Sequence, residues 1–232
     1  MTYRLHYSPD NASLIIRLAL EALDQPYQTH LIDRAARGHK APGYLTLNPN
    51  GLIPVLETPE GALFETGAIL LWLADRHGGL GPAPDSPERA DFLKWLFFLS
   101  NTLHPALRMT FYPDQYTGAD GHMQATLRRH MQGEIAHQLD TFERLAAQAP
   151  GWFAADPPSA LELYTACLLR WAALYPLGDC DWFKIGNWPL LQAMAARLDH
   201  CDSAIAAIHA EGLGQTPFSA PHYATPPEGS AT

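Results

Sequence analysis

Cysteine and the basic residues are scarce in this chain. Its three cysteines, Cys167, Cys180 and Cys201, are widely spaced. An odd number of cysteines without a C-x-x-C spacing fits neither a disulfide framework nor a redox or zinc motif. Lysine and arginine number 15 against 24 aspartates and glutamates, and no basic run is longer than two residues. Nucleic acid and anionic membrane surfaces are therefore not expected as partners.

Long apolar runs and cofactor motifs are absent as well. Residues 1–6 lack the apolar core of a signal peptide, and no later stretch has the eighteen or so apolar residues that a membrane span needs. We therefore expect a cytoplasmic protein that does not enter a membrane. The histidines, among them His122, His130 and His137, have no metal-ligand spacing, and no Walker A or G-x-G-x-x-G sequence occurs. Neither a metal nor a nucleotide cofactor is expected.

The first third of the chain alternates between strand and helix patterns. Apolar residues make up 47% of the 232 residues, which is enough for one large core or two modest ones. Alternation or apolar spacing predicts strands over 3–7, 27–32, 55–58 and 62–64, and helices over 13–24 and 66–77. A βαβ unit followed by a hairpin and a helix gives an α/β domain over 1–78 on one mixed sheet.

The remainder of the chain shows only helical patterns. Residues 78–88 contain three glycines and three prolines without periodicity, so we place a linker at 79–88. Helical spacing follows over 89–112, 120–149, 159–173 and 187–209, with a break near Cys201. The predicted fold class is α+β, with an all-α domain over 89–213. A tail over 214–232, rich in proline, serine and threonine, is expected to be partly ordered.

Pro54 lies at the start of a predicted buried strand, where a proline cannot donate to the strand ladder. A cis Ile53–Pro54 bond would turn the backbone of Ile53 outward, toward an extended peptide-like ligand. The alternative is an ordinary trans proline entering an edge strand. The residue type does not decide between them.

Glu65 and Thr66 fall where the hairpin ends and the next helix begins. Thr66 is a suitable N-cap, and Gly67 would allow a ligand to approach closely. The free N–H groups of the helix end suit a carboxylate, while Glu65 suits an ammonium group. Together they favour the head group of an amino acid, although a plain cap beside a solvated acid remains the alternative.

The order of these parts resembles that of the cytosolic glutathione transferases. The stretches "NPNGLIPVLE" and "EGALFETGAILLWLADRHG" carry the likeness, and "YSPDNASL", "LSNTLHPALRMTFYP", "LRWA" and "AEGL" resemble the bacterial beta class. The resemblance implies a thioredoxin-like βαβββα domain, an all-α domain, a homodimer and glutathione as co-substrate. It also implies conjugation of glutathione to small hydrophobic electrophiles. Alternatives are a glutathione-dependent disulfide or peroxide reductase and a non-catalytic glutathione-binding protein.

The resemblance also assigns residues to glutathione. The backbone of Ile53, before a cis Pro54, would pair with the cysteinyl part, and Glu65 and Thr66 would hold the γ-glutamyl end. Lys40 is a candidate for the glycyl carboxylate. His104 would reach the cleft from the α domain, although a histidine on a helix is more often a satisfied core residue.

The loop "YSPDNASL" would hold the sulfur. Ser13, at or just before the helix N-terminus, is our first choice for stabilising the thiolate, and its alternative role is that of a plain N-cap. Asn11 could donate an amide N–H, and Tyr7 matches the tyrosine that other classes use. The beta class has a cysteine where this chain has Ala12, so a mixed disulfide with glutathione is excluded at that position.

The second substrate is expected in an apolar pocket on the α-domain side. Trp171 belongs to it through the beta-class likeness, although a tryptophan there is more often core. The full predicted pocket is Leu103, Leu107, Phe111, Trp171 and Tyr175.

Overall fold

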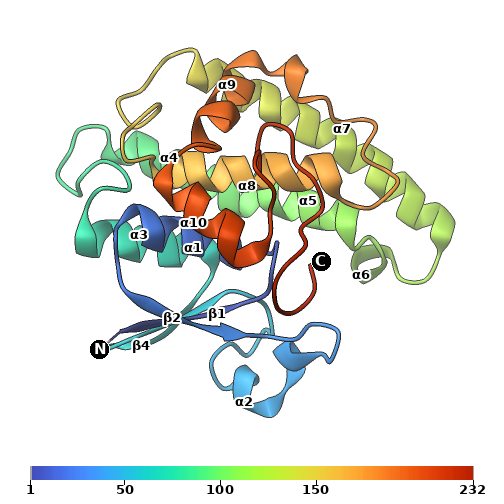
Figure 1. Ribbon diagram of the computed structural model, residues 1–232. Helices are drawn as coiled ribbons and strands as arrows, with labels where there is room; N and C mark the ends of the chain where they lie inside the picture. The colour runs from blue at the N-terminus through green and yellow to red at the C-terminus, as the bar shows by residue number, and fades with distance from the viewer. Residues whose placement is uncertain (1, 232) are drawn as a thin grey trace.

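The computed structural model describes residues 2–231 and has two parts, a small mixed sheet with its helices and a larger helical bundle (Figure 1). The first part consists of β1 (Tyr3–Tyr7), α1 (Ser13–Ala22), β2 (Tyr27–Leu31), the 3₁₀ turn η1 (Gly38–Lys40), α2 (Pro42–Leu45), β3 (Val55–Thr58), β4 (Gly61–Phe64) and α3 (Thr66–His77). The bundle consists of α4 (Arg89–Phe98), η2 (Leu99–Leu103), α5 (His104–Phe111), α6 (Asp114–Thr117), α7 (Gly121–Ala146), α8 (Ala160–Leu174), the 3₁₀ turn η3 (Ile185–Asn187), α9 (Pro189–Leu198) and α10 (Asp202–Glu211). The predicted α+β architecture is present.

The sheet has the strand order β2-β1-β3-β4. β1 and β2 are parallel, with Tyr3 opposite Tyr27, whereas β3 is antiparallel to both β1 and β4. In Figure 1 the short helix α2 lies on the opposite side of the sheet from α1 and α3. A small apolar cluster of Ile32, Tyr44 and Val55 fills the α2 side. The sheet is therefore covered on both faces, as a parallel βαβ unit requires.

The helix predicted over 89–112 is not a regular α-helix. α4 passes into a π-helical segment, η2, in which the N–H of His104 donates to the carbonyl of Leu99, five residues back. Pro105 follows directly and has no N–H for the regular ladder, which is the physical reason for a wide turn at this point. α5 then continues to Phe111.

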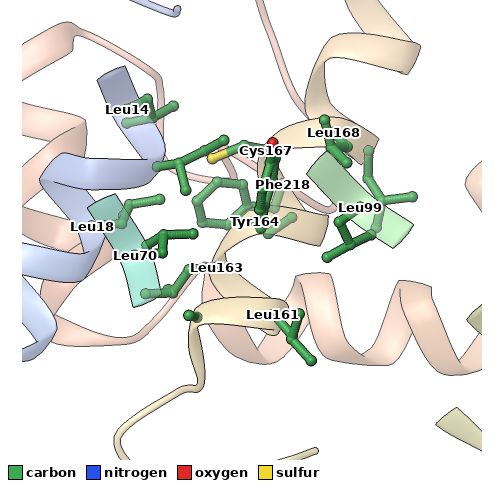
Figure 2. Packing of buried hydrophobic residues seen from close by; sticks show 14 of the residues in the cluster. Leu14, Leu18, Leu70, Leu99, Leu161, Leu163, Tyr164, Cys167, Leu168 and Phe218 are labelled. Carbon is green, nitrogen blue, oxygen red and sulfur yellow. The ribbon is translucent and has the colours of Figure 1, made fainter. Parts of the chain in front are cut away.

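One core joins the two parts. α1 packs against α3, α8 and α10. Figure 2 shows Leu14 and Leu18 of α1 and Leu70 of α3 facing Tyr164 and Cys167 of α8, and all of them belong to a single buried cluster. The sheet part and the bundle thus share an interior, which holds the surfaces between them in a fixed relation.

The C-terminal segment, for which the composition predicted partial order, is packed against the molecule at several points. Phe218 is buried, and its N–H donates to Asp199 Oδ1 at 2.8 Å. Further along, the Tyr7 hydroxyl donates to Glu228, which brings the end of the tail to the sheet (Figure 1, dark red). A few buried anchors thus hold a segment rich in proline and serine against the molecule.

Candidate functional site

A cavity of about 970 Å³ lies between the sheet part and the bundle. Its walls come from the loop after β1, the segment from Arg34 to Lys40, the residues before β3, the N-terminus of α3, helices α5 and α8, and Tyr223 of the tail. The volume is at the upper end of the roughly 300 to 1,000 Å³ that small-molecule sites occupy. The cavity therefore has room for a tripeptide and a second small molecule together.

The loop after β1 presents Asn11 and Ala12 to this cavity. The side-chain oxygen of Asn11 accepts from the N–H of Ala12 at 2.8 Å. Ala12 is the N-cap of α1, and the helix end receives no side-chain cap. This uncapped helix N-terminus favours negative charge beside it.

Ser13 and Tyr7 do not line the cavity in this structure. The Ser13 side chain is fully buried, and its hydroxyl donates to the carbonyl of Ser8 at 3.1 Å. The Tyr7 hydroxyl donates to Glu228, and burial together with that carboxylate raises the pKa of Tyr7. The Ser13 hydroxyl therefore stabilises the loop, and the Tyr7 hydroxyl holds the tail. Of the three candidates for the sulfur, the geometry brings only Asn11 to the cavity.

The two other predicted contact points of a tripeptide lie in the same cavity. The Ile53–Pro54 bond is cis, and both residues line the wall before β3. Glu65, Thr66 and Gly67 line the wall at the N-terminus of α3. The sequence pattern left the proline isomer open, and the structure has the cis form.

Glu65 has an uncommon backbone conformation. Its φ of 71° lies in the left-handed region, which is costly by about 1 to 3 kcal/mol for a residue with a side chain and is concentrated at functional sites. Glu65, and not Thr66 as predicted, occupies the N-cap position, without a side-chain cap bond. A Cβ at Gly67 would lie 3.1 Å from the Cβ of Ser100 in η2, a tight contact that leaves little room for a larger residue. The start of α3 is therefore pressed against the bundle with its N–H groups at the cavity.

A buried ion pair supports the loop from behind. Asp10 accepts from Arg170 Nε and Nη2, each at 2.8 Å, from Trp171 Nε1 at 2.9 Å and from the Tyr175 hydroxyl at 2.8 Å. Both members of the pair are fully buried. The N–H of Asp10 donates to Glu211 at 2.8 Å. Asn11 is adjacent in the chain, so this network sets where the cavity face of the loop lies.

Sequence reasoning missed this network. A signal was present, because Arg170 interrupts the apolar run of α8 and Arg17 interrupts that of α1. Arg17 pairs with Glu211 at 2.7 Å in the interior. A lone arginine within an apolar helix predicts a buried partner carboxylate, although it does not say which one.

His104 reaches the cavity from α5, as predicted. Its Nδ1 lies 2.8 Å from the Tyr164 hydroxyl, and its ring centroid lies 5.6 Å from that of Trp171. Desolvation, with a smaller effect of Arg108, lowers the pKa of His104 to about 4. The imidazole is therefore neutral at neutral pH and acts as a hydrogen-bonding group without charge.

Only some residues of the predicted apolar pocket lie at the cavity. Phe111, Trp171 and Tyr175 line the cavity. Leu103 and Leu107 do not, because they are buried in the interior core. Helical spacing placed all of these residues on apolar positions, but it did not distinguish the core side of α5 from the cavity side.

Besides His104, four basic side chains line the cavity, and of these four only Lys40 was predicted. Lys40 Nζ donates to the carbonyls of Asn50 and Gly51, at 3.2 Å each. Arg34, His39 and Arg108 are the additional ones. Arg34 and His39 lie near Lys40 in the sequence, but Arg108 comes from a distant segment, so no local pattern reveals that they meet.

Across residues 2–231, no group of three or more histidine, cysteine or acidic side chains is arranged to hold a metal ion. Over the same described residues, no helix combines the length and the apolarity needed to cross a membrane.

Comparison with known proteins places this arrangement in a family. The model of the glutathione S-transferase N-terminal domain matches residues 12–76. A glutathione S-transferase of Xanthomonas campestris is 28% identical over 90% of this chain and 99% of its own length. A maleylacetoacetate isomerase of Rhizobium meliloti is 31% identical over 85% of this chain and 91% of its own length.

Solved structures agree with these relatives. A sphingomonad glutathione S-transferase, complexed with glutathione, is 28% identical and superposes with a TM-score of 0.73 over 91% of this chain and all of its own. The predicted family and the thioredoxin-like fold with a helical second domain are thereby confirmed. The chain belongs to the glutathione S-transferase family.

Proposed function

We propose that this protein binds glutathione in the cavity and transfers its thiolate to an electrophile. One observation carries the proposal: a single cavity unites the backbone at Ile53 and cis Pro54, the start of α3 at Glu65, and the N-terminus of α1 at Asn11. These three points match, in order, the peptide backbone, the amino-acid head and the thiol end of one tripeptide.

The γ-glutamyl end lies at the start of α3 in this proposal. The Glu65 carboxylate binds the ammonium group, while the α3 N-terminus and Thr66 bind the carboxylate. The peptide N–H and carbonyl of Ile53 pair with the cysteinyl residue. Lys40 is left for the glycyl carboxylate, and its position next to Gly51 supports that assignment.

The sulfur then lies at Asn11 and the first turn of α1. A thiol with a pKa of about 8.5 is only a few per cent ionised at pH 7, and lowering it by two units requires about 2.7 kcal/mol. A hydrogen bond to a charged group contributes roughly 1.5 to 3 kcal/mol, and a helix N-terminus about 0.3 to 1 kcal/mol. The Asn11 amide together with the uncapped α1 is therefore sufficient.

The oligomeric state is also a proposal. We infer a homodimer from family membership, and the exposed Phe97 on α4, with 52% of its surface accessible, is consistent with a covering partner. Residence in the cytoplasm remains an expectation from the sequence.

The test combines glutathione binding with turnover. Calorimetric titration should show glutathione binding to the wild type and about 10- to 150-fold weaker binding to Glu65→Gln, because the charged hydrogen bond to the ammonium group is lost. Glu60→Gln is the matched control, since Glu60 is exposed on the hairpin and pairs with Arg76. Equal binding by Glu65→Gln would contradict the proposed orientation.

Turnover assays separate the alternatives. If the protein conjugates an aryl halide faster than it reduces a glutathione-bridged disulfide, the result supports the transferase. The reverse order supports a disulfide reductase, and tight binding without turnover of either supports a binding protein. If the wild type does not bind glutathione at all, the proposal fails in each of these forms.

A further inference from the structure

Arg34 and Arg108 face the same cavity from its two sides. Arg34 follows β2 in the sheet part, whereas Arg108 lies on α5 of the bundle, and both side chains are half-buried. Arg34 Nη2 donates to the Tyr112 hydroxyl at 2.8 Å, and the Arg108 guanidinium carbon lies 5.8 Å from the centre of the same ring. The two cations thus flank one tyrosine, and we call them the arginine pair.

The arginine pair has only neutral partners. Arg108 donates to the Tyr116 hydroxyl at 2.6 Å and to Gln115 Oε1 at 2.7 Å. Within residues 2–231, neither arginine has a carboxylate within 4 Å, whereas each of the other buried or half-buried arginines has one: Arg17, Arg89, Arg128 and Arg170. A partly desolvated cation without a counter-charge favours an anionic ligand.

The carboxylates at the cavity do not neutralise the pair. Asp10 is committed to Arg170, and Glu65 is assigned to the glutathione ammonium group. The pKa of His39, on the same wall, is lowered by burial and then by the charges of Lys40, Arg34 and Arg37. Although the chain has nine more acidic than basic residues, this wall is positive.

Aromatic side chains lie beside the arginine pair. Phe111, three positions after Arg108 on α5, has its ring centroid 6.2 Å from that of Tyr175, which lies 5.7 Å from Tyr223 of the tail. Flat apolar groups pack against such rings, and a guanidinium fork binds a carboxylate with two parallel hydrogen bonds. A planar ring with a carboxylate satisfies both surfaces.

We propose that the arginine pair binds a carboxylate of the second substrate, which is therefore an aromatic electrophile bearing an anionic group. This inference rests on the proposed function and names its substrate class. In an aryl-halide reaction the glutathione thiolate forms a C–S bond to the ring, the C–Cl bond breaks, and chloride leaves with the electron pair. The thiol proton passes to solvent, and the carboxylate is unchanged.

The experiment compares 4-chloro-3,5-dinitrobenzoate with the corresponding benzamide, after subtraction of the uncatalysed rate of each. For the wild type, kcat/KM should be about tenfold higher for the benzoate. Arg108→Gln should lower the benzoate value about tenfold and change the benzamide value less than twofold. Arg34→Gln should act in the same direction. Arg144→Gln, at an exposed position on α7, is the matched control and should leave both values unchanged.

Two results would overturn the proposal. One is an equal loss for benzoate and benzamide, which would indicate a general effect on the cavity. The other is a loss of glutathione affinity in Arg34→Gln or Arg108→Gln that matches the loss in rate, which would assign the arginine pair to the glycyl carboxylate.

A binding measurement keeps this inference separate from the proposed function. Unreactive 3,5-dinitrobenzoate should bind the wild type more tightly than 3,5-dinitrobenzamide does, with or without glutathione, and Arg108→Gln should remove the difference. If the wild type does not bind glutathione, the proposed function fails while this titration still tests the arginine pair. Equal binding of the two compounds by the wild type contradicts the pair as an anion site.

Discussion

Arg170 and Arg108 lie on neighbouring helices around one cavity, and their surroundings are opposite. Arg170 is fully buried and is saturated by Asp10 and by two carbonyls of the tail, those of Pro217 and His222. Arg108 is half-buried and has a hydroxyl and an amide oxygen as partners. A satisfied buried charge positions the backbone around it, whereas a cation without a counter-charge at a cavity is available to a ligand.

Replacing the two arginines tests this contrast most strongly. Arg170→Met should lower the free energy of unfolding by about 3 to 5 kcal/mol, because it leaves Asp10 buried without its partner. Arg108→Met should change it by less than about 0.5 kcal/mol, since no ion pair is broken. Urea denaturation at pH 7 measures both.

A double variant checks the cause of that loss. If the stranded Asp10 charge is responsible, Asp10→Asn combined with Arg170→Met should cost less than the sum of the two single changes. A loss for Arg170→Met no larger than for Arg108→Met would contradict the division into supporting and ligand-binding arginines.

The loop after β1 offers a similar contrast, between Asn11 at the cavity and Ser13 in the interior. Asn11→Ala should raise the pKa of the bound glutathione thiol by about one unit, because a hydrogen bond to the thiolate is lost. Ser13→Ala should leave that pKa nearly unchanged and reduce stability instead, since the Ser13 hydroxyl bonds the carbonyl of Ser8 in the interior. Thiolate absorbance titrations of both complexes measure the shift. A larger pKa shift for Ser13→Ala than for Asn11→Ala would indicate that Ser13 stabilises the thiolate, as the sequence analysis favoured.

His104 gives an effect that appears only as the pH changes. Its pKa is about 4 in the folded protein because burial disfavours the charged ring, against about 6.5 when unfolded. The unfolded chain therefore binds the proton first, so the stability contribution is present above pH 6.5 and is lost as the pH falls toward 4. Unfolding between pH 7.5 and 4.5 should show a shallower loss for His104→Gln than for the wild type. If the slope of unfolding free energy against pH is the same in His104→Gln and the wild type, His104 is not the group responsible.

Much of the fold follows from local pattern. The strand over Val55–Thr58 and the helix over Thr66–His77 lie where alternation and helical spacing predicted them. Ser159 and Glu162, three positions apart at the start of α8, form a capping box. The π-helical segment before Pro105 was missed because apolar periodicity over a few residues does not distinguish a 3.6-residue turn from a wider one.

The candidate site was predictable in part. Ile53, Pro54, Glu65, Thr66 and His104 lie at the cavity. The element ends at Pro54 and Glu65 were visible in the sequence pattern, whereas His104 was assigned through the resemblance. The roles of residues in the irregular loop were harder to predict, because no local pattern decides whether the side chain of Asn11 or that of Ser13 faces the cavity. Leu107 was placed at the pocket for a similar reason, as its position on α5 is apolar in either environment.

The sequence predicted the order of strands and helices, the position of the proline before β3 and the acid at the start of α3. Each of these features depends on residues that are neighbours in the sequence. The orientation of the loop after β1 depends instead on Asp10 and Arg170, which are 160 positions apart. The packed tail and the arginine pair likewise need contacts between distant segments. Such contacts depend on which surfaces the folded chain buries together, so only the tertiary structure decided them.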